Sequence, residues 1–154
     1  MNLFILDLDH DKNAKYHVDK HCSKMILESQ QIICSVFTLQ GIQAPYKLSH
    51  QNHPCNIFAR NSRENFQWVK DYCFSLSKEF IYRYDKVHKS SLLLKWVSEN
   101  ESRLSFPKHG ATPFALAMPD EYKTDDPVES YRNYYRNEKQ HLFNWKNRDK
   151  PEWL

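Results

Sequence analysis

Four ionisable side chains follow one another at helical spacing near the start of the sequence. His17, His21, Lys24 and Glu28 stand at i, i+4, i+7 and i+11, so one helix would place them in a row. This row lies beside a stripe of apolar residues, where partial loss of hydration shifts pKa values. We expect His17 and His21 to act as acid and base, Lys24 as an electrostatic or Schiff-base group, and Glu28 as an orienting group or a stabiliser of an oxocarbenium ion. An amphipathic helix with ordinary boundary ion pairs, such as Lys24 with Glu28, would show the same pattern.

A second candidate segment, His53-Pro54-Cys55, precedes the next long helix and is followed by Arg60. We expect His53 to be exposed enough for chemistry and, with Arg60, to complete the pocket.

Histidine spacing also raises the question of a metal. His17 and His21 have the i, i+4 spacing of helical metal ligands, and His50, His53, Cys55 and His88 could complete a shell. No H-E-x-x-H arrangement or matching second pair is present. We therefore expect no metal and no other cofactor.

Cations interleaved with rings indicate contacts to phosphates and bases. Arg and Lys fit phosphate geometry, and unstacked bases stack on aromatic rings. The expected nucleic-acid or phosphate ligands are Lys20, Arg60, Arg83, His88, Arg132, Tyr135 and Arg136. Cations near the end of a helix are also favoured by its dipole, and tyrosines at helical spacing are also typical of a core.

The elements that must position these groups are mainly helices. Periodicity predicts a helix over 11–39, a second one capped by Asn61 with Glu64 in a capping box, a short one over 91–100, and one capped by Asp126 with Pro127 at its first position. Residues 2–8 form a short strand or an extended arm, residues 43–60 a connection, residues 104–124 an ordered loop, and the C-terminal tail packs through its tryptophans. The fold class is therefore all-α, a compact single domain over 1–154 with an extended N-terminal arm and long ordered loops.

Composition excludes several classes of protein. With 154 residues, 40% hydrophobic and 27% charged, the chain fits one globular domain. No stretch approaches the roughly 20 apolar residues of a membrane span, so we expect no membrane partner. The four cysteines form no C-x-x-C pair, which is typical of a reducing, cytoplasmic protein without a disulfide framework.

Several sequence blocks resemble a small phage and bacterial family of uncertain role. They are Asp19-Lys20-His21 with Lys24-Met25, Asn52-His53-Pro54-Cys55, Arg83-Tyr84 with Lys86-Val87-His88, Pro113-Phe114-Ala115, Tyr131-Arg132 with Tyr134-Tyr135, and Pro151-Glu152-Trp153. More distantly, the order of the N-terminal arm, the first helix, the His-Pro loop and the aromatic-Pro-Trp tail resembles the pyrimidine-dimer DNA glycosylases, the phage endonuclease V family.

The second resemblance implies an endonuclease V-like all-α fold and the removal of a damaged or modified base that is taken out of the stack. That family attacks the sugar with the amine of the residue after the removed methionine, helped by a glutamate on the first helix. Asn2 is larger than the residues that normally allow methionine removal. The resemblance therefore implies base removal and does not extend to lyase activity.

The leading hypothesis is thus a phage-type, DNA-directed hydrolase of the glycosylase kind. The same cationic pocket also suits a protein that binds or degrades a small nucleotide, such as a cyclic dinucleotide in phage–host conflict. A third hypothesis is a non-catalytic DNA-binding module or inhibitor. The partner is DNA or a nucleotide in all three cases, and the sequence does not predict an oligomeric state.

Overall fold

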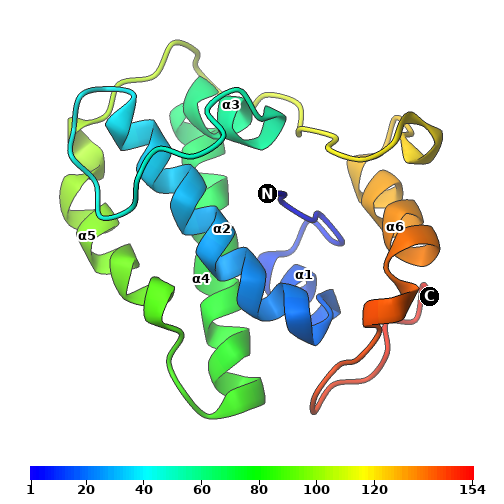
Figure 1. Cartoon of the computed structure of the whole chain (residues 1–154). Coiled ribbons are helices and arrows are strands. Elements are labelled where there is room, and N and C mark those ends of the chain that lie inside the picture. Colours follow the sequence, from blue (N-terminus) through cyan, green and yellow to red (C-terminus); the bar gives the residue numbers. More distant parts are fainter.

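The structure is a computed structural model that describes residues 1–154, and it consists of α-helices, short 3-10 turns and loops (Figure 1). The α-helices are α1 (His10–Tyr16), α2 (Asp19–Thr38), α3 (Pro54–Asn61), α4 (Arg63–Tyr84), α5 (Leu93–Asn100) and α6 (Pro127–Glu138). There is no β-strand, only an isolated bridge between Ser62 and Lys108. The predicted all-α class is confirmed.

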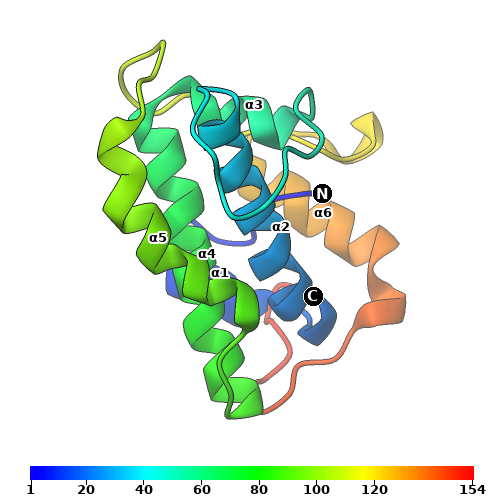
Figure 2. The same cartoon turned by 60° about the vertical axis from the view of Figure 1, so that its left-hand side comes forward.

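The two long helices α2 and α4 form the centre of the molecule, and α5 and α6 lie on opposite sides of them (Figure 1). The view in Figure 2 shows α3 near one end of α4 and α1 alongside the middle of α4, and both helices pack against it. The buried apolar side chains form one cluster, to which the arm and all six α-helices contribute. On α2, Cys22, Met25, Ile26, Ile33 and Val36 are buried, as the apolar stripe predicted.

The predicted continuous helix over 11–39 is wrong, because the chain breaks between α1 and α2. His17 and Val18 both have extended backbone, with ψ values of 133° and 155°. The fully buried guanidinium of Arg83 donates to the carbonyl oxygens of Lys15 at 3.1 Å and His17 at 2.8 Å. It thus satisfies acceptors that the end of α1 leaves free, and this makes the break tolerable without Gly or Pro.

The helix caps confirm one predicted boundary and correct another. Asp126 accepts a hydrogen bond from Val128 N at 2.9 Å, and Pro127 is the first residue of α6, as predicted. The predicted cap Asn61 is wrong by one residue, since Ser62 caps α4 through Asn65 N at 3.1 Å. Asn61 instead ends α3, a helix that lies mostly inside the predicted connection 43–60.

The N-terminal arm is extended and buried, with Leu3, Phe4, Ile5 and Leu6 at most 3% exposed. It runs between α2 and α6 (Figure 1), and side chains of both helices contact it. The C-terminal tail packs through its tryptophans as predicted, because Trp145 Nε1 donates to the Tyr16 carbonyl at 2.9 Å. None of the helices combines the length and apolar character that crossing a bilayer requires.

A buried ion-pair network joins the helices to the tail. Arg83 donates to Glu79 Oε1 and to Asp19 Oδ1, each at 2.9 Å. Arg148 from the tail donates to both oxygens of Glu79, at 2.9 and 3.0 Å. Asp19 also accepts from Asn144 Nδ2 at 2.7 Å. One guanidinium therefore holds α1, α2 and α4 together, and its two acid partners hold the tail.

Replacing Arg83 by methionine is expected to lower the free energy of unfolding by about 3–5 kcal/mol, because Glu79 and Asp19 would lose a buried partner. Urea unfolding followed by circular dichroism measures this change. Arg103→Met, at an exposed site, is the control and is expected to stay within about 0.5 kcal/mol of the wild type. A similar small effect for Arg83→Met would contradict the structural role of the network.

Candidate functional site

The carboxylate of Glu28, on α2, is nearly buried and lies between two amines. The residue is only 7% exposed. Its Oε2 accepts a hydrogen bond from the backbone N–H of Asn2 at 3.0 Å and lies 3.6 Å from the amine of Met1. Its Oε1 lies 3.4 Å from Nζ of Lys24, one helical turn earlier, whose side chain is 61% exposed. The arm and α2 thus bring a buried acid and two amines together, and only the Lys24 side chain among them is largely exposed.

Asn2 anchors the arm beside Glu28. Its Oδ1 accepts from Leu3 N at 2.7 Å and from the Tyr131 hydroxyl at 3.2 Å, and its Nδ2 donates to the Ala117 carbonyl at 2.9 Å. These contacts connect the arm to α6 and to the loop before it.

His53, at the start of α3, lies close enough to Glu28 and to the Met1 amine for their charges to act on it. Its Nδ1 accepts a hydrogen bond from Cys55 N at 3.1 Å, so the proton of the neutral ring is on Nε2. Partial burial lowers the pKa of His53, and the positive charges of the Met1 amine and of His50 lower it further, while Glu28 opposes the shift. His53 is therefore a neutral hydrogen-bond donor at neutral pH.

His21 faces the arm from α2 and is almost completely buried. Its ring stacks on Phe4 with centroids 4.4 Å apart, and its Nδ1 lies 2.7 Å from the Tyr135 hydroxyl. Burial, assisted by His17 and Lys139, lowers the pKa of His21 to about 3. The ring is thus neutral and held by packing.

The expected row of four side chains is wrong at His17, because the break before α2 turns this residue inward. His17 is fully buried, with Nδ1 2.7 Å from the Asn13 carbonyl and Nε2 2.9 Å from the Tyr72 hydroxyl. Burial lowers its pKa to about 4. The Tyr72 hydroxyl in turn accepts from Phe4 N at 3.3 Å. In this place His17 supports the arm, and it has no access to a substrate for acid–base catalysis.

Three residues expected to bind phosphate or nucleic acid have internal partners instead. Arg83 is buried in the network described above, Tyr135 is fully buried, and His88 caps a 3-10 turn through Ser90 N at 3.1 Å. Burial and these contacts leave Arg83 and Tyr135 no surface for a ligand.

The two predicted ligands Arg132 and Arg136 hold the arm and tail. Arg132 Nε donates to the Leu6 carbonyl at 2.9 Å, and Arg136 Nε donates to the Trp153 carbonyl at 3.0 Å. Both guanidinium groups also lie over the Trp153 ring, at 4.9 and 5.6 Å from its centroid. Their charges are therefore used largely within the chain, whereas Lys20 is exposed on α2.

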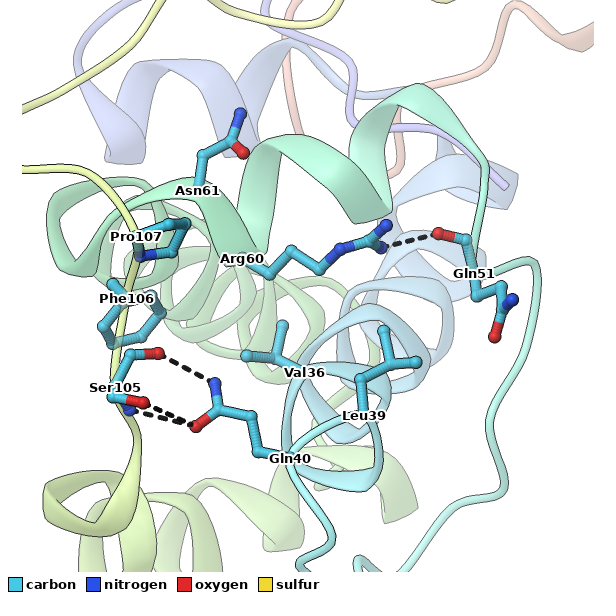
Figure 3. A pocket seen from close by; sticks show the side chains of 9 residues that line it. All are labelled: Val36, Leu39, Gln40, Gln51, Arg60, Asn61, Ser105, Phe106 and Pro107. Carbon is cyan, nitrogen blue, oxygen red and sulfur yellow. Dashed lines mark hydrogen bonds between the residues drawn. The ribbon is translucent and has the colours of Figure 1, made fainter.

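Arg60 does not join the Glu28 site. It lies beside a hollow of about 580 Å³ near the C-terminal end of α2, with Val36, Leu39, Phe106 and Pro107 among the lining residues. Figure 3 shows its side chain reaching across this hollow, where the guanidinium donates to the Gln51 carbonyl at 2.5 Å. Val36 follows Glu28 by roughly two helical turns on α2, so the hollow is separate from the buried acid.

Sequence reasoning missed three residues at or near the site, namely Asn2, Tyr131 and Lys139. Asn2 carries a weak signal, since it is a polar residue directly before the buried run Leu3–Leu6. Lys139 places its Nζ 4.7 Å from the Tyr134 ring centroid and 5.9 Å from that of Phe4. No local pattern points to Tyr131 as a partner of the arm.

No group of three or more His, Cys, Asp or Glu side chains is arranged to hold a metal ion. The expectation that the protein uses no cofactor stays a prediction from the sequence.

No family model, curated protein or solved structure matches the chain significantly. The two resemblances drawn from the sequence blocks, including the endonuclease V-like form of the all-α fold, therefore stay predictions.

The two buried histidines are expected to make stability depend on pH. Their folded-state pKa values lie below the unfolded value of about 6.5, so the unfolded chain binds more protons as the pH falls. The stability that the two neutral histidines provide is fully present above about pH 6.5 and is lost as the pH falls toward about 4 for His17 and about 3 for His21. In His17→Gln and in His21→Gln, the drop in unfolding free energy from pH 7 to pH 5 should each be about 2 kcal/mol smaller than in the wild type. Equal drops in variants and wild type, measured by urea unfolding, would contradict the neutral buried state.

Proposed function

We propose that this chain is a DNA-directed enzyme of the glycosylase type that removes a damaged or modified base. The observation that carries the proposal is the nearly buried Glu28 carboxylate with the Met1 and Lys24 amines 3.6 and 3.4 Å from its oxygens. An amine beside a carboxylate suits attack on the anomeric carbon of a sugar, where positive charge develops as the bond to the base breaks.

The reaction balances with the groups present. The ammonium group of Lys24 or Met1 first loses one proton to water. The neutral nitrogen then bonds to the sugar C1′ while the C1′–N bond to the base breaks, and the base leaves with the electron pair and takes up a second proton, which the attacking nitrogen releases. Transfer of the last N–H proton to O4′ opens the sugar ring and gives the imine that cyanoborohydride reduces. Glu28 stabilises the positive charge on the sugar during this step. His53 Nε2–H can donate a hydrogen bond to the leaving base and so stabilise its developing negative charge.

Exposed and half-exposed cations near Lys24 and His21 support a nucleic-acid partner. Lys20 and Lys24 are one helical turn apart on α2, and both are exposed. Lys139 and Lys24 both lie close enough to His21 to lower its pKa. A polyanion that crosses this face would have its phosphates neutralised while one nucleotide reaches Glu28.

Trapping the covalent intermediate tests the chemistry. The full chain is incubated with duplex oligonucleotides that carry a pyrimidine dimer, a modified pyrimidine or an abasic site, in the presence of cyanoborohydride. We expect a reduced protein–DNA adduct that mass spectrometry locates on Lys24 or on the Met1 amine. Glu28→Gln keeps the size and an acceptor oxygen but loses the charge, and should slow adduct formation about a hundredfold.

Glu99→Gln, on an exposed part of α5, is the matched control and should react like the wild type. An adduct elsewhere, or equal rates for Glu28→Gln and the wild type, would overturn the proposed role of this site.

Salt dependence of binding separates DNA from a small nucleotide. For a DNA partner, the logarithm of the association constant should fall linearly with the logarithm of salt concentration, with a slope of several. Lys20→Ala and Lys139→Ala should each reduce that slope by about 1, whereas the distant control Lys95→Ala should not.

Fluorescence anisotropy with labelled duplexes measures the slope. A shallow slope that none of these substitutions changes would favour the nucleotide-binding alternative. Steep, lysine-dependent binding with no base release from any duplex would favour the non-catalytic DNA-binding module.

A further inference from the structure

The arm is extended but pairs with no other strand, so its peptide groups need other partners. Every backbone hydrogen bond of residues 2–6 ends on a side chain. Asn2 N donates to Glu28, Leu3 N to the Asn2 side chain, Phe4 N to the Tyr72 hydroxyl, and Leu6 N to Asn13. The position of the arm beside Glu28 therefore depends on individual side chains rather than on a sheet.

A side-chain contact between Tyr131 and Asn2 also attaches the arm near Glu28, and the two residues are 129 positions apart in the sequence. Tyr131 is fully buried on α6, and its hydroxyl shares its one hydrogen between the Ala115 carbonyl at 2.7 Å and Asn2 Oδ1 at 3.2 Å. It also accepts from Ala117 N at 3.3 Å. Burial raises its pKa well above the usual range, so the hydroxyl remains a neutral donor at neutral pH.

The Asn2 side chain closes the link between α6 and the acid. Its Oδ1 accepts from Tyr131, its Nδ2 donates to the Ala117 carbonyl, and its own backbone N–H donates to Glu28 Oε2. Asn2 thus fixes both the direction of its N–H and the place of the adjoining Met1 amine.

We propose that Asn2 and Tyr131 are positioning residues that hold the arm, and with it the Met1 amine, against the Glu28 carboxylate. This inference rests on the proposed function for its catalytic consequence. Neither side chain needs to touch the substrate. Without the Tyr131 hydroxyl, Asn2 Oδ1 would lose its anchor on α6, and a displacement of the arm by about 1 Å is enough to cost up to a hundredfold in rate.

The kinetic test uses Tyr131→Phe and Asn2→Leu, which are close in size to the residues they replace, and the double variant. Each single variant should lower the single-turnover rate of adduct formation about tenfold or more. The dissociation constant for DNA should remain within about twofold, because no phosphate contact changes. The double variant should be no slower than the slower single variant, since both changes remove the same link. Tyr82→Phe, which loses an exposed hydrogen bond to the Asn147 carbonyl, is the matched control.

A second measurement needs no DNA substrate. Formaldehyde and cyanoborohydride methylate amines, and mass spectrometry gives the relative rates at Met1 and Lys24. The arm holds the Met1 amine 3.6 Å from Glu28 Oε2. Loosening the arm should make this amine more accessible to formaldehyde and raise the Met1-to-Lys24 ratio about threefold or more in Tyr131→Phe. Thermal unfolding shows whether a variant is folded, and Asn2→Leu serves if Tyr131→Phe is not.

The outcomes separate this inference from the proposed function. An unchanged methylation ratio in both folded variants would overturn the positioning role, whatever the activity on DNA. Additive rate losses in the double variant would also overturn it. A raised ratio in the variants, together with no adduct from the wild type on any duplex, would support the positioning role while overturning the glycosylase proposal.

Discussion

The guanidinium of Arg83 is the interaction on which the rest of this structure depends. It is fully buried and donates hydrogen bonds to two acids and two main-chain carbonyls. It therefore holds the end of α1, the start of α2 and the C-terminal end of α4 together. A buried charge is tolerated only when its hydrogen-bonding capacity is met, and Arg83 meets this condition by fixing a break in the first helix. The same break turns His17 inward, where it supports Tyr72 and through it the arm. The geometry around Glu28 is thus set partly by a residue far from it.

The candidate site combines opposite requirements in a small space. Glu28 is sheltered enough for its charge to act strongly, yet one of its partners, Lys24, is largely exposed. The arm supplies the second amine. Stacking of Phe4, in the arm, on the His21 ring of α2 helps to keep the arm in place. His53 completes this arrangement as a neutral donor from a different helix. Three elements, α2, the arm and the start of α3, therefore lie around one carboxylate, which is a feature of sites that bring several groups to bear on one bond.

Local chemistry made much of this predictable from the sequence. The cap Asp126 and the following Pro127 placed the start of α6, and i, i+4 spacing predicted the Lys24–Glu28 pair. The row that included His17 failed because residues 17 and 18 lack any helix-breaking signal. The break is stabilised by Arg83, 66 residues away, and no pattern within 11–39 records it. The Asn2–Tyr131 contact joins residues 129 positions apart, so the periodicity of a local segment cannot predict it either. The two arginines of α6, Arg132 and Arg136, were expected to bind a ligand and instead contact the arm and Trp153. A pattern of charges does not show which charges fold inward.

The way the arm is attached has one more consequence. Neighbouring strands in a sheet share a ladder, so they separate cooperatively along their length. Here each of the amides of Asn2, Phe4 and Leu6 is secured to a side chain of a different helix, α2, α4 or α1. These hydrogen bonds can open one at a time, beginning at Asn2, while the helices stay intact. The segment nearest Glu28 can therefore loosen and return without any unfolding of the scaffold.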